Sequence, residues 1–422
     1  MKIKKTICVI DHSDFGYVAM ELTRFYEKVY YCYTDWRSAF LEPSAKKMFT
    51  GFPDVEVIPS IDGYKDLIDT FFFTDIAFQD LSEALKEEGR HVWNSGQTEQ
   101  LEIDRKVFID SLKEAGLPVP ETDFCETIEE LEKYLKGKSD LYVKISGFRG
   151  IRETFPYIDD THAASTLNAI KAKVGCFDGD KDINYAIQKP IPTKYEWGTE
   201  SVVVKGKFNE NCFMGFEQKG CSYFTRFMPM SDLPKDMLEV HSKYEKVLER
   251  TDYTGNFSNE VRTGEDGKQY FIDITPRMGF PCSATYFAMG DNWGDVIEGS
   301  FEGKNIPLKS KVKYGCETII MTSCHDEYNA LSFDEKYKDN IKPCVSAMRS
   351  GVIFRLPNNQ LYNVSEKLCT VVTTGNDIEK IIKENSEICA NIKETGVSYD
   401  CAMLTCFKKN IEDLKTETGI KF

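Results

Sequence analysis

Residues 256–281 have the sequence NFSNEVRTGEDGKQYFIDITPRMGFP, and this stretch decides the fold of the chain. Two segments with strand character, Asn259–Arg262 and Tyr270–Ile274, flank the turn residues Gly264–Gly267. Short β-prone runs on either side of a glycine-containing turn are typical of a β-hairpin. The stretch therefore predicts two antiparallel strands.

This hairpin also carries two acidic residues that can act together. Strand alternation places Asp273 on one face with Thr275, and Glu260 shares that face if the partner strand is in register. Paired carboxylates followed by Pro276 and Arg277 suit a Mg²⁺ ion held between protein oxygens and substrate phosphates. An ordinary solvated hairpin is the alternative interpretation.

A lysine upstream of the hairpin is the next candidate. Lys144 lies in the apolar strand Leu141–Ile145 and is followed by the loop Ser146–Gly150, with sequence SGFRG. A strand lysine next to a glycine loop can neutralise a phosphate while backbone N–H groups surround it. The alternative is a lysine that extends along an edge strand into solvent. Lys106, on the helix expected before this strand, is even less specific by itself.

The first hundred residues alternate between strand and helix patterns. The expected helices and strands here are Thr6–Ile10, Val18–Phe25, Val29–Tyr33, Val55–Ile58, Asp80–Glu88 and His91–Trp93. This alternation predicts an α/β layer with a parallel sheet. One helix is then expected over Glu99–Ala115, and Thr127 with Glu130 forms a capping box for another that runs to Leu135.

The remaining patterns complete the expected organisation. Further strands are expected at Ala186–Gln188, Ser201–Val204, Glu317–Met321, Gly351–Phe354 and Thr370–Thr373, with a polar helix near Asp377–Lys393. The last hundred residues therefore predict a smaller α/β appendage.

Composition limits the classes of function. The chain has 422 residues, which at roughly 150 per domain predicts two or three domains. Its 53 basic and 68 acidic residues give a formal charge of −15. Such a chain is a poor partner for duplex nucleic acid or an anionic membrane, because both require a cationic surface. Any anionic ligand must therefore be held by local positive charge.

Cysteine usage and the N-terminal segment indicate a compartment. The 14 cysteines include no CxxC pair, which is typical of a reduced interior. The segment MKIKKTICVI stops being apolar at Asp11, too early for a signal peptide or a membrane span. We expect a soluble, cytoplasmic protein.

The order of these motifs gives them a specificity that none has alone. Lys106, then GLPVPET, the strand lysine Lys144 with its glycine loop, AIQKPI, EWGTESVVVKGKF and finally the acidic hairpin follow one another. This succession resembles the ATP-grasp superfamily of carboxylate ligases over about residues 100–280. The layout is most similar to phosphoribosylamine–glycine ligases and to ligase-like relatives often found in phages.

The resemblance implies a fold and a set of domains. It implies an α/β protein with α+β parts and the ATP-grasp fold. Its expected parts are a Rossmann-like pre-ATP-grasp domain at 1–98, an ATP-binding catalytic domain at 99–306 and a C-terminal α/β domain at 307–422.

It also implies roles for individual residues. The implied ATP-binding residues are Lys106, Lys144, Ser146, Gly147, Gly150, Gln188, Lys189, Ile191 and Glu196, with Glu200 competing for the ribose-binding role of Glu196. The implied catalytic residues are Arg277, Lys144 and Arg149, and the implied Mg²⁺ or Mn²⁺ ligands are Glu260, Asp273 and Thr275.

Two departures from the family pattern bear on these roles. Thr275 supplies a hydroxyl where an asparagine is usual, which puts a second metal ion in question. The segment 219–234, KGCSYFTRFMPMSDLP, lacks the glycine-rich stretch of true glycine ligases. The substrates are therefore expected to differ from those of a purine-pathway enzyme.

The substrate is expected near the first loop. Asp11, His12, Ser13 and Gly16 follow a strand, and Arg226 is added as a further substrate residue. No zinc spacing occurs among the five histidines, and Cys282 fits a buried small residue better than a nucleophile.

The predicted function is ATP-dependent joining of a carboxylate to an amine through an acylphosphate, with release of ADP and phosphate. The expected partners are small-molecule substrates and a second copy of the chain, without duplex nucleic acid or membrane. The alternatives are a thiol or hydroxyl acceptor on the same scaffold, or a nucleotide-binding protein without catalysis.

Overall fold

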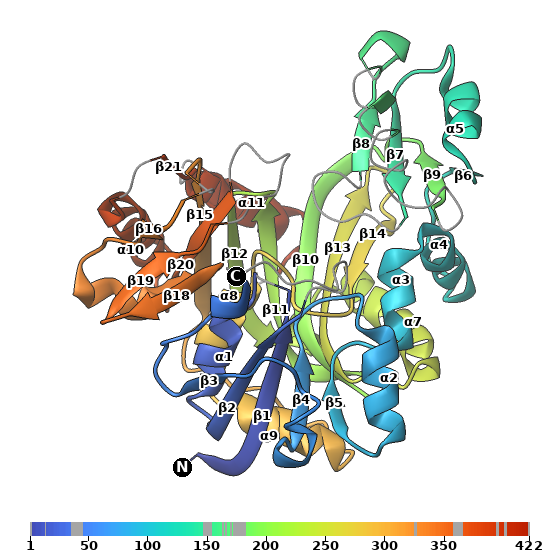
Figure 1. The fold of residues 1–422 in the computed structure, drawn as a ribbon. Helices are drawn as coiled ribbons and strands as arrows, with labels where there is room; N and C mark the ends of the chain where they lie inside the picture. Colours follow the sequence, from blue (N-terminus) through green and yellow to red (C-terminus); the bar gives the residue numbers. More distant parts are fainter. Residues whose placement is uncertain are drawn as a thin grey trace.

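The structure is a computed structural model, and it describes residues 2–12, 14–34, 45–146, 154–162, 164, 167–168, 171, 183–324, 327–357, 366–393, 396–400 and 403–420. Figure 1 shows a body built around a long sheet, with a smaller lobe projecting from it. The α/β class expected from the sequence is confirmed.

The N-terminal residues form a parallel sheet, as the alternating pattern predicts. Its strand order is β3-β2-β1-β4-β5. The run Ile7–Ile10 is fully buried, as expected for a central strand of a parallel sheet. The bounds are β1 Ile3–Asp11, α1 Tyr17–Leu22, β2 Tyr26–Tyr33, β3 Val55–Val57, β4 Thr70–Phe73, α2 Gln79–Glu87 and β5 His91–Trp93; β4 is not among the expected strands.

The expected helix Glu99–Ala115 is wrong as a single element. The chain forms α3 (Gln100–Ile103) and α4 (Arg105–Glu114), separated at Asp104, whose backbone is extended. The Asp104 carboxylate accepts hydrogen bonds from the N–H groups of Lys106 and Val107, so it caps α4. This local competition for the backbone ends the first helix, and apolar periodicity alone does not reveal it.

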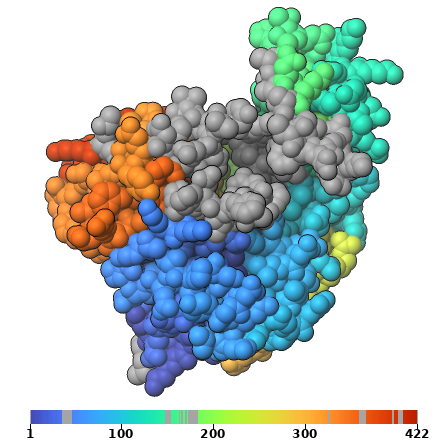
Figure 2. All heavy atoms as spheres, in the orientation of Figure 1, coloured from blue at the N-terminus to red at the C-terminus, as the bar shows by residue number. Residues whose placement is uncertain are grey.

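The projecting lobe in Figures 1 and 2 is a four-stranded sheet in the order β6-β9-β7-β8, covered by α5. Its bounds are β6 Thr122–Cys125, α5 Ile128–Leu135, β7 Leu141–Ile145, β8 Thr154–Tyr157 and β9 Tyr185–Gln188. The capping residue Thr127 accepts a hydrogen bond from the Glu130 N–H, as predicted. The lobe has its own apolar core, which includes Leu131 and Val143.

The long sheet runs β14-β13-β10-β11-β12-β15-β20-β17, with β21 paired to β15. The predicted hairpin is β13 and β14, joined at Gly264–Gly267. The other bounds are β10 Thr193–Val204, β11 Lys207–Gln218, β12 Ser222–Pro229, α7 Lys235–Arg250, β13 Gly255–Gly264, β14 Gln269–Thr275, α8 Ser283–Met289, α9 Trp293–Phe301, β15 Tyr314–Thr322, β17 Ile341–Pro343, β20 Glu366–Gly375 and β21 Val397–Ser398.

The C-terminal strands therefore extend the same sheet, through the pairing of β12 with β15. A separate three-stranded sheet, β16 (Asn329–Ala330), β19 (Val352–Arg355) and β18 (Ser346–Arg349), lies beside them with α10 (Ile378–Asn391) and α11 (Met403–Thr418). One apolar cluster contains Tyr17, Trp293 and Val371, so it spans all three expected domains. The domain boundaries at 98/99 and 306/307 stay predictions.

The separate core of the lobe leads to a stability prediction. Leu131 is fully buried there, so Leu131→Ala leaves a cavity and should lower the free energy of unfolding of the lobe by about 2–5 kcal/mol. Leu67→Ala is the control, because Leu67 is 58% exposed and should change little. Hydrogen exchange of the lobe amides, compared with amides of β1, measures the effect. Equal loss of protection in both regions would contradict an independent core.

Candidate active site

The junction between the lobe and the edge strand β14 of the long sheet, which we call the cleft, holds a cluster of charged side chains. Lys144, on β7 of the lobe, donates from Nζ to the carbonyl oxygen of Ile272 at 2.6 Å. Arg105, at the start of α4, donates from Nη1 to Asp273 Oδ1 at 2.5 Å. Arg105 from α4 and Lys144 from the lobe thus both contact β14.

The two hairpin carboxylates face each other as the alternation argument requires. Glu260 and Asp273 are Cα partners across β13 and β14. Glu260 pairs with Lys219 at 2.6 Å, and its Oε1 is buried without a hydrogen bond, with Arg262 Nη2 at 3.8 Å. A buried acceptor oxygen that no donor satisfies is suited to a cation ligand.

Asp273 is the electrostatic centre of the cleft. Burial by itself would raise the pKa of its carboxyl, but the Arg105 and Lys144 cations lower that pKa far below the ordinary value. Lys144 Nζ lies 3.6 Å from Asp273 Oδ2. The carboxylate is therefore ionised wherever the protein is folded at neutral pH.

The structure separates Arg105 from Lys106, its neighbour. Arg105 is 1% exposed, whereas Lys106 lies on the solvent face of α4 and pairs with Asp110 at 2.8 Å. Helix geometry turns adjacent residues about 100° apart, so only one of the two can face the cleft. The sequence predicted Lys106 as a phosphate-binding residue, whereas Arg105 is the residue that contacts Asp273. Asp104 was the residue that could have indicated this, because an N-cap at Asp104 makes Arg105 the first residue of α4.

The expected adenine hinge joins the lobe to β10. Gln188 Nε2 donates to Thr122 Oγ1 at 3.1 Å, and the Lys189 N–H donates to the Glu121 carbonyl at 3.2 Å. The Ile191 carbonyl accepts from Thr193 Oγ1 at 2.7 Å. These bonds tie the hinge residues to β6 and to the start of β10, at one end of the cleft.

Glu196 and Glu200 share the cleft face of β10 but differ in environment. Glu196 accepts from Arg262 Nε at 2.9 Å and is partly exposed, and burial followed by Glu260 raises the pKa of its carboxyl. Glu200 is 5% exposed and accepts from Ser258 Oγ at 2.7 Å. Burial raises the pKa of Glu200 to about 8. Of these two acids, Glu196 is therefore the more accessible to a ligand.

Gly279 explains why Glu200 is closed off. A Cβ at Gly279 would lie 3.4 Å from Glu200 Oε2 and 2.6 Å from Cys282 Sγ. The loop after β14 therefore lies against the Glu200 carboxyl, and a side chain at position 279 would collide with the Cys282 Sγ, which favours glycine there.

Ser146 fixes the start of the expected phosphate loop. It is 1% exposed, its Oγ donates to Asn184 Oδ1 at 2.7 Å, and it accepts from the Arg105 N–H at 3.0 Å. The remaining loop candidates Gly147, Arg149 and Gly150, together with Ser13, lie outside the described residues.

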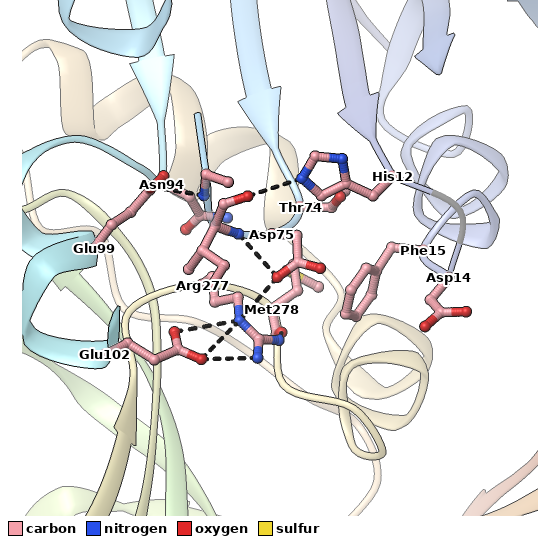
Figure 3. Close-up of polar contacts among 12 residues, drawn as sticks. His12, Asp14, Phe15, Thr74, Asp75, Asn94, Glu99, Glu102, Arg277 and Met278 are labelled. Atoms are coloured by element: carbon pink, nitrogen blue, oxygen red, sulfur yellow. Dashed lines mark hydrogen bonds and ion pairs between the residues drawn. The ribbon is translucent and has the colours of Figure 1, made fainter. Parts of the chain in front are cut away.

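Arg277 lies where the loop after β14 meets the N-terminal sheet (Figure 3). Its Nη2 donates to Glu102 Oε1 at 2.9 Å, and its Nε lies 3.1 Å from Asp75 Oδ1. Asp75 follows β4, so this contact links two parts of the molecule. Thr275, two residues before Arg277, shares the strand face of Asp273, and its Cα partner is Ser258.

The predicted substrate residues Asp11, His12 and Gly16 contact other residues of the N-terminal part of the chain. Asp11 is fully buried and accepts from Tyr31 Oη and Thr74 Oγ1 at 2.8 and 2.9 Å. The two ring nitrogens of His12 lie 2.8 Å from the carbonyl oxygens of Thr34 and Ile76. Gly16 begins α1 against Phe49, where a Cβ would lie 1.9 Å from the ring. These contacts shape the loop.

Arg226 does not join the other candidates. It is the Cα partner of Met214, whereas its neighbour Thr225 is the partner of Gly215. Alternation then places Arg226 on the face of the sheet opposite to Glu200, Glu260 and Asp273. Conversely, sequence reasoning missed Arg105, Lys219, Glu102 and Asp75, each of which contacts a predicted site residue.

The described part of the chain lacks two features, a ready cluster of metal ligands and a membrane-spanning helix. Within those residues, no group of three or more His, Cys, Asp and Glu side chains is placed to hold a metal ion. No helix there is both long and apolar enough to cross a membrane.

Comparison with known proteins gives a fold. No family model matches the sequence, and no curated protein matches it. Solved structures do match: the phosphoribosylamine–glycine ligase of Thermotoga maritima has a TM-score of 0.70 at 14% identity, covering 93% of this chain and 98% of that one. N5-carboxyaminoimidazole synthetase of Staphylococcus aureus has a TM-score of 0.58 at 13% identity, covering 93% and 99%.

A third match contains nucleotide. The biotin carboxylase domain of the Hydrogenobacter thermophilus 2-oxoglutarate carboxylase, described as a dimer in complex with MgADP, ADP and bicarbonate, has a TM-score of 0.65 at 13% identity. The match covers 100% of this chain and 96% of that chain. The chain has the fold of the ATP-grasp carboxylate–amine ligases, and the expected resemblance is confirmed at the level of the fold.

The burial of Glu200 generates a pH prediction. Its pKa rises from an ordinary 4.5 to about 8 on folding, so the folded state binds an extra proton between these values. Stability should therefore fall as pH rises through this window, by up to about 1.4 kcal/mol per pH unit. Glu200→Gln keeps an acceptor for Ser258 and should reduce this slope, while Glu99 and Glu217, whose pKa values are raised to about 7 by burial, keep part of it. Urea unfolding at pH 5, 6.5 and 8 measures it.

Glu210→Gln provides the matched control for that experiment, because Glu210 lies exposed on the neighbouring strand β11. It should keep the slope of the original protein. A Glu200→Gln protein with the same pH slope as the Glu210→Gln protein would show that Glu200 does not hold the proton.

Proposed function

We propose that this protein is an ATP-dependent ligase that joins a small-molecule carboxylate to an amine and releases ADP and phosphate. The observation that carries the proposal is the convergence of Arg105 and Lys144 on Asp273, opposite Glu260, in the cleft between the lobe and β14. The ATP-grasp fold supports it, because the similar structures include a complex with MgADP.

The proposed nucleotide site follows the cleft from the hinge to β14. Adenine is assigned to the hinge residues Gln188, Lys189 and Ile191, and the ribose to Glu196, the more exposed of the two acids on β10. The phosphates are assigned to Lys144 and Ser146, with the loop residues Gly147, Arg149 and Gly150. We assign the second phosphate cation to Arg105 instead of Lys106, because Arg105 faces the cleft.

A divalent metal ion fits the hairpin carboxylates. Glu260 Oε1 is a buried oxygen without a donor, and Asp273 is held ionised, so both can bind Mg²⁺ or Mn²⁺. The ion would supply charge neutralisation for the phosphates. Only these two carboxylates are assigned with Thr275, so most of the remaining ligands would come from phosphate and water.

The proposed chemistry has two steps. The carboxylate substrate attacks the γ-phosphorus of ATP, which forms an acylphosphate and ADP. The amine then attacks the acyl carbon, and phosphate leaves. In this scheme Arg105, Lys144 and Arg277 neutralise negative charge that develops on the phosphoryl oxygens. The loop carrying Asp75 contacts Arg277, and His12 contacts that loop at the Ile76 carbonyl, so the loops of His12 and Asp75 are assigned to the acceptor substrate.

Two further assignments belong to the same proposal. A thiol or hydroxyl acceptor would use the same first step, and a nucleotide-binding protein without catalysis is the reading that Thr275 favours. We also propose a cytoplasmic location and a homodimer, the latter by analogy with the dimeric biotin carboxylase domain. Screening pairs of carboxylates and acceptors for ADP release, with mass spectrometry of products, distinguishes an amine acceptor from a thiol or hydroxyl acceptor, and an enzyme from a protein without catalysis.

The charge cluster predicts which substitutions abolish ADP formation. Lys144→Ala removes a cation from the proposed phosphate site, and Asp273→Ala removes a metal ligand. Each should lower ADP formation by at least about 100-fold. Circular dichroism checks that both variants fold. Undiminished turnover in both variants would sink the ligase assignment.

The neighbouring cations on α4 give a second, sharper prediction. Arg105→Met should weaken binding of a fluorescent ATP analogue by at least about tenfold, because it removes the buried guanidinium at Asp273. Lys106→Met should bind the analogue about as well as the original protein, since Lys106 pairs with Asp110 at the surface. Arg105→Lys, which keeps the charge, should recover part of the affinity. Weaker binding of the analogue by Lys106→Met than by Arg105→Met would assign Lys106, and not Arg105, to the phosphate site.

A further inference from the structure

Asp14 and Lys367 form an ion pair between segments at opposite ends of the chain. Asp14 follows β1, and Lys367 is the second residue of β20. Lys367 Nζ donates to Asp14 Oδ2 at 2.7 Å. The side chains are 33% and 30% exposed, so solvent reaches both charges.

Aromatic rings join this pair to the loop that carries Arg277. Lys367 Nζ lies 3.8 Å from the centroid of the Phe280 ring. Phe280 packs edge-on against Phe15, with ring centroids 5.9 Å apart. In Figure 3, Phe15 lies between Asp14 and the Asp75–Arg277 contact. The ion pair therefore stands at the acceptor end of the proposed active site.

A second pair between the same parts of the chain shows what a purely structural contact looks like. Lys342, on β17, donates to Glu21, on α1, at 2.5 Å, and the two side chains are 9% and 7% exposed. Arg24 adds a second cation to Glu21. By contrast, within the described residues neither Asp14 nor Lys367 has another ion-pair partner. Solvent reaches this pair, so a ligand can insert between the two charges and bind each of them.

We propose that Asp14 and Lys367 recognise the amine substrate, and that this substrate is a small amphoteric molecule. Its ammonium group binds Asp14, and its anionic group binds Lys367. This assignment rests on the proposed function, since it names the class of the amine acceptor, and it adds a residue from the C-terminal part to the site.

The physical reason lies in the balance of charge. A ligand with a single charge would pair with one residue and leave the other without a counter-ion, which costs free energy in a partly desolvated site. An amphoteric ligand gives each residue a new partner, so the pair can open without leaving an uncompensated charge. The Phe280 ring contacts the ammonium group of Lys367 and so helps to orient it beside Asp14.

Binding without turnover tests the proposal. Glycine, β-alanine and 4-aminobutyrate serve as amphoteric probes, and ethylamine and propionate serve as singly charged controls, in isothermal titration of the full chain. At least one amphoteric probe should bind about tenfold or more tightly than both controls. Equal or absent binding of all five probes would overturn the proposal.

Variants separate recognition from a structural role. Asp14→Asn and Lys367→Met should each weaken the best probe by about tenfold or more, whereas Lys367→Arg should retain it. Glu21→Gln, the matched control at the buried pair, should lower the melting temperature without changing probe affinity. Unchanged probe affinity in Asp14→Asn and Lys367→Met would refute the assignment.

The ligase assignment is judged by a separate measurement. Probe binding requires no ATP and no product, so a chain that never forms ADP can still show it. Conversely, ADP release with acceptors that lack an anionic group, unaffected by Lys367→Met, would support the ligase and refute the amphoteric acceptor.

Discussion

The carboxylate of Asp273 is the interaction on which the cleft depends. It lies on the edge strand of the long sheet, and its charge is balanced by Arg105 from α4 and Lys144 from the lobe. Since a partly buried carboxylate is costly without counter-charges, this contact holds the lobe and α4 against β14. In the proposed nucleotide site, a triphosphate would compete for the same two cations, so its binding would be coupled to the position of the lobe.

Much of the fold follows from local patterns, because the elements concerned are periodic or bounded by clear turns. The hairpin of β13 and β14, the parallel strand β1 and the capped helix α5 are of this kind. The break at Asp104 could not be read from periodicity, since it depends on a side chain competing for backbone N–H groups. The same break decides that Arg105 faces the cleft.

The arrangement of the candidate residues was predictable where two of them lie on one strand pair, and not where they come from distant segments. Register places Glu260 opposite Asp273, and alternation alone suggests it. Lys219 and Asp75 have no sequence signal, because their contacts with Glu260 and Arg277 arise only when separate strands pack. Arg226 shows the converse: a charged residue near the right strands can face away, since one step along a strand reverses the side chain.

The charge of −15 is reconciled with an anionic ligand by how the acids are held. Glu200 lies against the loop at Gly279, and burial raises the pKa of its carboxyl to about 8, so it would add little repulsion near the proposed phosphate site at neutral pH. Glu260 and Asp273 are matched by Lys219, Arg105 and Lys144. A metal ion that replaced Lys219 at Glu260 would free that lysine to face the substrate. In the proposed site, such an exchange would alter the local charge without any change in the acidic surface around it.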